Sequence, residues 1–350
     1  MPANLYVHFP FCRRKCSYCA LHSRAGASSA EREAYVARLV TAIGSCQSQA
    51  AADVGFSTVY FGGGSPALCD LLPVLDALAP RLAKDCEVTV ELHPLDVTVP
   101  LLNTLHAGGV NRISMGVQSL DDAILADMGR GYSFAEAERA FALVRERFDN
   151  AGIDLIVGYP GETVALSPRH GRLAKWGLRH CSVYSLILEE RSILAHRLRS
   201  AAEHPRLPSD DEALNRIAVV SRFLGALGLH RYEISSYAVP GYECRHNLAV
   251  WRGEDYLGLG EGAAGRVGLV RTSWENGQAR SVRVDAAVDR KERALFRLRT
   301  CDGLDIAAFP EWAEPLDAFC AQGLLSRSST VYRLTERGTE VCDTILAELV

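Results

Sequence analysis

The sequence lacks long hydrophobic runs and low-complexity tracts. Within its 350 residues, no segment approaches the roughly 20 consecutive apolar residues of a membrane-spanning helix. The start of the chain, Met1 to Leu5, has neither the charged nor the apolar region of a signal peptide, so we expect a cytoplasmic protein without a transmembrane segment. Because 48% of the residues are hydrophobic, the chain can bury a large core, and disorder is not expected.

An excess of positive charge is also lacking. Lys and Arg number 38 and Asp and Glu number 42, which gives a net charge of −4, and the cationic residues are spread along the sequence. A nucleic-acid-binding surface requires a basic patch or stripe. The sequence therefore predicts no nucleic-acid partner.

Cysteine, in contrast, is abundant. Eleven cysteines in a chain without a secretion signal indicate reduced thiols and metal ligands rather than a disulfide framework. Cys244 stands apart because it lies two residues before His246. Seven others are isolated in the sequence and are expected to pack as small hydrophobic side chains, namely Cys46, Cys69, Cys86, Cys181, Cys301, Cys320 and Cys342.

The remaining three cysteines, Cys12, Cys16 and Cys19, lie within eight residues and follow a short apolar run. Three thiolates on a [4Fe-4S] cluster leave one iron open to another ligand, whereas a structural zinc ion is normally closed by four protein ligands. Taken alone, the triplet fits three interpretations: this cluster, a Cys3His zinc site completed by His8 or His22, or three unliganded loop thiols.

Short β-rich runs alternate with helical patterns up to residue 190. Ser28 and Glu31 can form a capping box at the start of the first helix. This βα repeat predicts an α/β fold with a partial (β/α)6 barrel of the TIM type, which places its chemistry at the carboxyl ends of the strands. The expected strands are residues 5–9, 58–61, 88–92, 112–117, 153–157 and 182–188.

The pattern changes after residue 190. Residues 191–288 combine a helical stretch with a Gly-rich segment and do not continue the barrel repeat. Residues 289–350 contain a helical pattern, a turn at Gly323 and a short strand before a last helix, which predicts a small winged-helix-like α+β appendage. We therefore expect three units: 1–190, 191–288 and 289–350.

Small and polar residues recur where the expected strands end. Gly62 to Gly64 follow the second strand, and glycines there let backbone amides approach a ligand, although a tight turn would explain them equally well. Each of the later residues is also compatible with an ordinary structural role, and only their recurrence favours one common site. These later residues are Glu91, Gln118, Arg130 and Asp154.

Together, these segments resemble the radical S-adenosylmethionine (SAM) superfamily over nearly the whole chain. The Cys12-x3-Cys16-x2-Cys19 loop, with Tyr18 before the last thiol, is similar to the superfamily's signature. The resemblance implies that the three thiolates hold a [4Fe-4S] cluster whose open iron chelates the amino and carboxylate groups of SAM. It further implies a cofactor-binding set of Tyr6, Tyr18, Gly62, Gly63, Gly64, Ser65, Glu91, Gln118, Arg130 and Asp154.

Within this superfamily, residues 113–119, 154–161 and 232–237 resemble the oxygen-independent coproporphyrinogen III oxidase group, and more closely its heme chaperone branch, HemW. The oxidases carry a further cysteine two residues after the triplet, where this chain has Leu21, and a longer N-terminal extension. Both differences favour the chaperone branch.

The resemblance also implies a heme-associated motif. The chaperone pattern His-Asn-x-x-Tyr-Trp is matched by His246, Asn247 and Trp251, while Val250 replaces the tyrosine. The imidazole of His246 can ligate heme iron. The alternative is that His246 and Trp251 only pack within their segment.

Two functions follow from the resemblance. The first is a chaperone that binds heme and a SAM-ligated cluster and passes heme to accepting proteins such as respiratory cytochromes, with an electron donor and a second copy of the chain as further partners. The second is a radical enzyme that converts coproporphyrinogen III to protoporphyrinogen IX by oxidative decarboxylation. No catalytic residue is assigned from the sequence.

Overall fold

The computed structural model describes residues 4–45, 55–163, 165–200, 206–275 and 277–349. It contains a sheet with the strand order β14-β13-β12-β11-β1-β4-β5-β6-β7-β8-β10-β9. The two edge strands, β14 and β9, do not pair with each other in the described residues, so the barrel is open. The predicted partial barrel is thus confirmed. Its central parallel strands are β1 (Asn4–Phe9), β4 (Phe56–Gly63), β5 (Leu82–Leu92), β6 (Arg112–Gln118), β7 (Asn150–Val157) and β8 (His180–Ser185).

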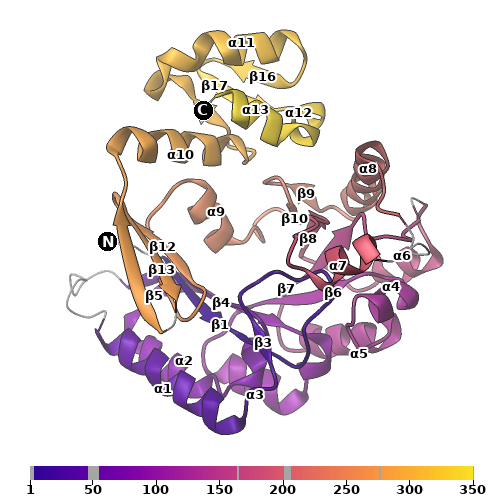
Figure 1. Ribbon diagram of the computed structural model, residues 1–350, viewed down its shortest axis with the longest axis vertical. Coiled ribbons are helices and arrows are strands. Elements are labelled where there is room, and N and C mark those ends of the chain that lie inside the picture. Colours follow the sequence, from indigo (N-terminus) through magenta and orange to yellow (C-terminus); the bar gives the residue numbers. More distant parts are fainter. Residues whose placement is uncertain (1–3, 46–54, 164, 201–205, 276, 350) are drawn as a thin grey trace.

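Helices cover the outer face of this curved sheet (Figure 1). The capping box of Ser28 and Glu31 is confirmed, since the Glu31 amide donates to Ser28 Oγ at 3.3 Å and the Ser28 amide donates to Glu31 Oε2 at 2.8 Å. None of the described helices has the length and hydropathy needed to cross a membrane. The helices of this part are α1 (Ser29–Ser45), α2 (Leu72–Leu78), α3 (Val99–Ala107), α4 (Asp122–Asp127), α5 (Phe134–Arg145), α6 (Pro168–Leu173), α7 (Ile193–Ser200) and α8 (Asp210–Ala226).

The strands alternate between apolar and polar side chains. In β4, Val59 and Phe61 are fully buried in the hydrophobic core. Successive side chains of a strand point to opposite faces, so the intervening Thr58 and Tyr60 lie on the other face of the sheet, inside the barrel. The barrel interior is therefore polar, and it can position charged groups.

Strand β8 is shorter than predicted. The sequence predicts a strand over residues 182–188, but β8 ends at Ser185, where its pairing with Val157 of β7 also ends. Strand β7 stops there because Gly158 turns the chain with a φ of 86°. The Leu186 amide still donates to the Val157 carbonyl at 2.8 Å, but the strand does not continue, and Leu186 and Ile187 line the cavity at the mouth of the barrel.

Residues from the second expected unit extend both edges of the sheet. Strand β11 (Tyr256–Leu259) pairs in parallel with β1, which adds a parallel strand that the Gly-rich sequence did not indicate. At Gly258, an added Cβ would lie 2.0 Å from the Ala264 carbonyl oxygen, so glycine is required for close backbone packing. The boundaries of the three units stay a prediction. The other added strands are β9 (His230–Arg231), β10 (Ser236–Ala238), β12 (Ala264–Val267), β13 (Val270–Glu275) and β14 (Gln278–Arg283).

The C-terminal part forms the expected α+β appendage with its own core, which includes Leu298, Leu316 and Tyr332. It lies at one end of the molecule, and its helix α10 lies between the barrel and the remaining elements of the appendage (Figure 1). Its strands pair in the order β15-β17-β16. Its elements are α10 (Ala286–Leu298), β15 (Leu304–Asp305), α11 (Ala313–Ala321), β16 (Leu325–Ser328), β17 (Val331–Leu334), α12 (Glu336–Glu340) and α13 (Cys342–Glu348).

The isolated cysteines only partly follow the prediction. Cys69, Cys86, Cys181 and Cys342 are buried, as is Cys244. The prediction is wrong for Cys301, which is exposed, and Cys320 is only half-buried. Cys301 lies in the turn between α10 and β15, where its amide donates to the Tyr232 carbonyl while its thiol stays outside the core. Cys46 lies outside the described residues.

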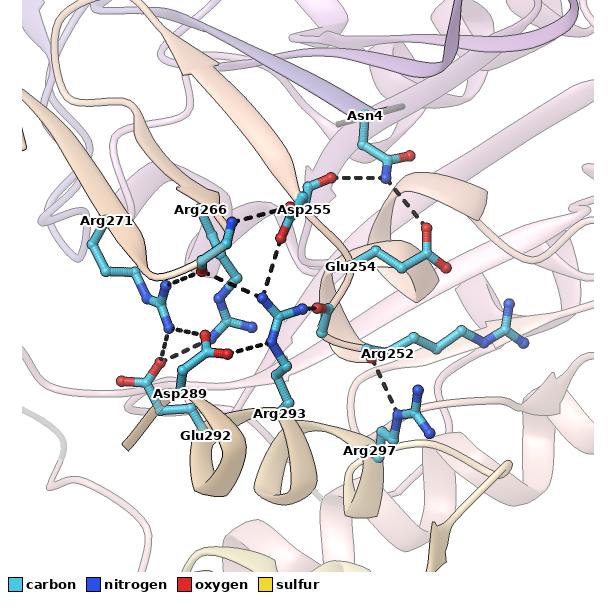
Figure 2. A network of polar contacts seen from close by, with 12 residues as sticks. Asn4, Arg252, Glu254, Asp255, Arg266, Arg271, Asp289, Glu292, Arg293 and Arg297 are labelled. Carbon is cyan, nitrogen blue, oxygen red and sulfur yellow. Dashed lines mark hydrogen bonds and ion pairs between the residues drawn. The ribbon is translucent and has the colours of Figure 1, made fainter. Parts of the chain in front are cut away.

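Ion pairs fasten α10 to the neighbouring strands, as Figure 2 shows. Asp289 accepts hydrogen bonds from Arg271 of β13 at 2.6 Å and from Arg293 at 2.8 Å. Arg293 also donates to Asp255, just before β11, at 3.1 Å. Glu292 accepts from Arg271 at 2.8 Å. Asp289 is only 8% exposed, so this network lies partly out of water and holds the appendage to the barrel.

We predict that Asp289→Asn lowers the free energy of unfolding by about 1–3 kcal/mol, because two arginines lose a charged acceptor in a mostly buried place. Urea denaturation measures this change. The matched control is Arg206→Gln, which removes the exposed pair with Glu212 and should cost less than about 1 kcal/mol. Equal losses in the two variants would contradict the prediction.

Candidate functional site

The cysteine loop connects β2 (Phe11–Cys12) to β3 (Arg24–Ala25), which pair in parallel at the mouth of the barrel. Within the loop, Lys15 Nζ donates to the Leu21 carbonyl at 2.6 Å and to Ser23 Oγ at 2.7 Å. These bonds join the two arms of the loop. These hydrogen bonds within the protein therefore hold the loop together without a bound metal.

The middle of the loop is tied to two helices. The Ser17 amide donates to the Met128 carbonyl at the end of α4 at 3.0 Å, and the Leu194 amide of α7 donates to the Ser17 carbonyl at 2.7 Å. Ser17 Oγ also lies 3.0 Å from the Tyr159 hydroxyl. Figure 1 shows the loop as the indigo segment that crosses the open barrel toward α7. Ser17 thus fixes the thiols on either side of it, Cys16 and Cys19.

All three thiols of the loop line one cavity of about 450 Å³. They are half-buried and form no disulfide. Arg130 Nη1 donates to Cys16 Sγ at 3.3 Å, and its Nη2 donates to the Gly116 carbonyl at 2.8 Å. Arg130 therefore places a fixed positive charge beside the Cys16 sulfur.

The two histidines considered as a fourth zinc ligand interact with other groups, and the Nε2 atom of His22 lies 3.7 Å from Glu261 Oε1. His8 Nε2 lies 2.8 Å from the His22 carbonyl oxygen, and His8 Nδ1 lies 3.1 Å from the Tyr6 hydroxyl. Neither His8 nor His22 lines the cavity with the thiols. In the described part of the chain, no group of three or more His, Cys, Asp and Glu side chains, the three thiols included, is placed to hold a single metal ion. Three thiols at an open cavity fit a [4Fe-4S] cluster with one open iron better than a closed zinc site.

The glycine turn after β4 is required by the protein's own packing. Gly63 has a φ of 109°, and a Cβ there would lie 2.6 Å from His8 Cε1. At Gly64, a Cβ would lie 2.4 Å from the Phe11 carbonyl oxygen. These glycines let β4 approach the start of the cysteine loop. A larger side chain at this position, as in Gly63→Val, would therefore disturb the packing against His8 as well as obstruct a ligand.

Two carboxylates enter the cavity from β5 and β7, which lie on either side of β6. Glu91 accepts from the Tyr60 hydroxyl at 2.8 Å and from the Gly63 amide at 3.1 Å, and Asp154 accepts from Ser114 Oγ at 3.1 Å. Burial, together with the nearby Asp154, raises the pKa of Glu91 to about 7. Burial also raises the pKa of Asp154. A cationic ligand in the cavity would favour the ionised form of both groups.

Gln118 ends β6 with a φ of 67°, which is unusual for a residue other than glycine. At Gly116, a Cβ would lie 2.6 Å from Gln118 Nε2, so the amide folds back over the strand. Tyr18 packs against the small cluster that contains Tyr159 and Ile156. Both Gln118 and Tyr18 line the cavity.

Most of the predicted site residues meet in this one cavity. Of the others, Gly62 lies next to the Glu91 carboxylate, and Ser65 donates to Asp96 instead. Tyr6 stacks on Tyr60 with the ring centres 6.0 Å apart. The predicted residues that line the cavity are Cys12, Cys16, Cys19, Tyr18, Gly63, Gly64, Glu91, Gln118, Arg130 and Asp154.

His246 lies elsewhere, in α9 (Arg245–Trp251). Its side chain is buried, its Nδ1 lies 2.8 Å from Thr58 Oγ1, and its amide donates to Glu87 Oε1 at 3.1 Å. Burial, helped by Arg112, lowers the pKa of His246 to about 3. The imidazole is therefore neutral and held against the strands of the barrel.

Trp251, at the other end of α9, packs edge-on against Phe296 of α10, and the Arg299 guanidinium lies 5.0 Å from its ring centre. The structure thus shows the packed arrangement for both His246 and Trp251. Their heme-binding role stays a prediction.

The sequence alone did not reveal the residues that support the carboxylates. Tyr60 and Ser114 hold Glu91 and Asp154, and Tyr184, at the end of β8, lines the cavity. Tyr60 and Ser114 each lie two residues before a glycine on the inner face of a strand. Because side chains of a strand alternate between its two faces, the residue two positions before each glycine could have been predicted to face the cavity.

Comparison with known proteins agrees with the resemblance to the radical SAM superfamily and to HemW. Residues 6–165 match the radical SAM superfamily. The heme chaperone HemW of Mycobacterium tuberculosis is 31% identical over 377 aligned positions, covering 100% of this chain and 95% of that protein. The heme chaperone HemW of Escherichia coli is 30% identical, covering 99% of this chain and 97% of that protein. The structure of coproporphyrinogen III oxidase (HemN) from Escherichia coli superposes with a TM-score of 0.82 at 21% identity, covering 99% of this chain and 89% of that one.

We predict that replacing any of Cys12, Cys16 or Cys19 with Ala abolishes the absorbance of an anaerobically reconstituted [4Fe-4S] cluster, because these three thiols share the cavity. The control is Cys301→Ala, which removes an exposed thiol outside the loop and should leave the absorbance unchanged. An intact cluster in the triple Ala variant, or stoichiometric zinc in the anaerobic preparation, would refute this assignment.

A second prediction concerns pH. The pKa of Glu91 is raised from 4.5 to about 7, so between these values the folded chain binds a proton that the unfolded chain releases. This contribution to stability is present below the unfolded pKa and is lost as pH rises through 7. In Glu91→Gln the loss is absent, so the variant should gain stability relative to the wild type as pH rises from about 5 to 8. Thermal unfolding of the cluster-free chain measures this difference. If the stabilities of the wild type and Glu91→Gln change in parallel with pH, the pKa of Glu91 is not raised by folding.

Proposed function

We propose that this chain, which belongs to the HemW family within the radical SAM superfamily, is a heme chaperone that binds heme and delivers it to target proteins. The observation that carries the proposal is similarity over the whole chain to proteins named heme chaperone HemW from distant bacteria. A match confined to the radical SAM region would have supported only the cluster chemistry.

The cavity supplies the residues for the cluster and for SAM. Cys12, Cys16 and Cys19 would hold the cluster, which can supply one electron at a low potential when it is reduced. Glu91 and Asp154 would attract the cationic groups of SAM and orient it. Arg130 would stay hydrogen-bonded to Cys16 and keep a positive charge beside the cluster.

The partners of this function are a heme-accepting protein and an electron donor. By resemblance, the acceptors are proteins such as respiratory cytochromes, and a second copy of the chain could serve as a dimer partner. Whether SAM is cleaved during this cycle decides if the chain is also an enzyme.

The second candidate function is oxidative decarboxylation of coproporphyrinogen III. It is supported by the shared fold with the Escherichia coli oxidase, and at 21% identity this likeness concerns the fold alone. Leu21 stands where that group of oxidases carries its additional cysteine, and it lines the cavity here. The sequence difference therefore falls at the site itself, which favours the chaperone.

We predict that the reconstituted, SAM-loaded protein binds heme with a defined stoichiometry and does not convert coproporphyrinogen III. Heme titration followed by the Soret band, beside an anaerobic turnover assay on the same preparation, measures both. Formation of protoporphyrinogen IX at a catalytic rate would establish the second function instead. A wild type that binds no heme would refute the chaperone proposal.

A further inference from the structure

Large hydrophobic side chains are exposed at the rim of the cluster cavity. Ile187 is 74% exposed, Leu21 is 57% exposed and Tyr184 is 43% exposed, and all three line the same cavity. Ile187 is the most exposed of the large hydrophobic residues in the described part of the chain. We call these three residues the apolar rim.

The apolar rim comes from two separate segments. Leu21 belongs to the cysteine loop, while Tyr184 is the second-last residue of β8 and Ile187 lies in the stretch that leads to α7. The bond from the Leu194 amide to the Ser17 carbonyl holds the two segments together. The rim residues therefore come from two segments whose backbones are joined by this hydrogen bond. Exposure of this apolar surface to water is unfavourable, so a flat apolar ligand that covered it would gain binding free energy.

A positive charge lies within this rim. Lys15 lines the cavity, and its ammonium group is bonded to the Leu21 carbonyl at 2.6 Å, to Ser23 Oγ at 2.7 Å and to the Ser23 carbonyl at 3.4 Å. All three acceptors are neutral, and Lys15 forms no ion pair with any carboxylate of the described residues. An anionic ligand group at the rim would therefore find an unneutralised cation.

In the segment that carries the heme-associated motif, the His246 imidazole is less accessible to a heme than the apolar rim is. His246 is only 5% exposed, and its Nδ1 is held by Thr58. The Glu87 carboxylate accepts the amides of both Arg245 and His246 at 3.1 Å, which anchors the start of α9 to β5. A heme iron could reach this imidazole only after α9 had moved off the barrel.

We infer that heme is held at the mouth of the barrel, with one face against the apolar rim of Leu21, Tyr184 and Ile187 and a propionate toward Lys15. This inference rests on the proposed chaperone function and deepens it by naming the heme site. An apolar disc with carboxylates at one edge matches an apolar surface that contains one cation. Heme at this place would cover the cavity that holds the cluster and SAM, which explains how one chain could link their occupancy.

The test is heme titration of the full-length, reconstituted, SAM-saturated protein. Ile187→Asp and Leu21→Asp should each weaken heme binding about ten-fold or more, the change that corresponds to about 1.4 kcal/mol. The matched control is Val282→Asp, which places the same charge at a side chain of β14 that is 65% exposed and does not line the cavity. Its heme affinity should stay within about two-fold of the wild type, a change of less than about 0.5 kcal/mol.

Two further variants separate the ligand contacts. Lys15→Gln should weaken binding of heme but not of its dimethyl ester, which has no free propionate. His246→Gln, which keeps a hydrogen-bonding group near Thr58, should bind heme as the wild type does. Cluster absorbance and SAM affinity are measured in every variant. Ile187 lies outside the cysteine loop, so Ile187→Asp reports on heme even where Leu21→Asp or Lys15→Gln loses the cluster.

The outcomes are distinguishable. Unchanged heme affinity in Ile187→Asp, together with loss of heme in His246→Gln, would overturn the inference and leave the chaperone function standing with heme at α9. Equal weakening in Val282→Asp and Ile187→Asp would overturn the inference as well, because the effect would then be one of charge alone. Absence of heme binding by the wild type would overturn the proposed function itself.

Discussion

The site depends on one constraint: the cysteine loop is fixed to the mouth of the barrel by its own backbone. The Ser17 amide and carbonyl are bonded to α4 and α7, and the Gly64 amide donates to the Phe9 carbonyl at 2.7 Å, which brings the turn after β4 against the start of the loop. A free loop would have to order its thiols when the cluster binds, at a cost of about 1–2 kcal/mol for each residue fixed. Here that ordering is supplied by folding, and the three thiols face one cavity.

The polar interior of the barrel follows from the same architecture. The strands bury their apolar faces under the helices, so their other faces must carry the polar groups that enter the cavity. Tyr60 and Ser114 hold Glu91 and Asp154 there, and burial raises the pKa of both carboxyl groups although these hydrogen bonds act in the opposite direction. Such groups are only partly satisfied by the protein and become fully ionised when a cation is bound. The cavity is therefore prepared for a ligand such as SAM, whose sulfonium and ammonium groups are positive.

The sequence predicted the parts of this protein that depend on local pattern. The central strands, the capping box at Ser28, the thiol loop and the small residues after β4 all followed from spacing and residue type. What it missed depends on pairing between distant segments. Strand β11 pairs with β1, and Gly258 lets the backbone of Ala264 in β12 approach β11 closely. Strand β8 ends where β7 no longer offers a partner. The burial of His246 could not be foreseen, because the bonds from Thr58 and Glu87 come from strands far away in the sequence. The exposure of Ile187 follows in turn from the early end of β8.

The central claim is that Cys12, Cys16 and Cys19 hold a cluster with one iron open to SAM. Electron-nuclear double resonance of the reduced, reconstituted protein tests it most directly, with SAM labelled in its carboxylate and amino groups. The account predicts hyperfine coupling from both labels to the cluster, and its loss when unlabelled SAM is exchanged in. A cluster spectrum that saturating SAM leaves unchanged would contradict the claim.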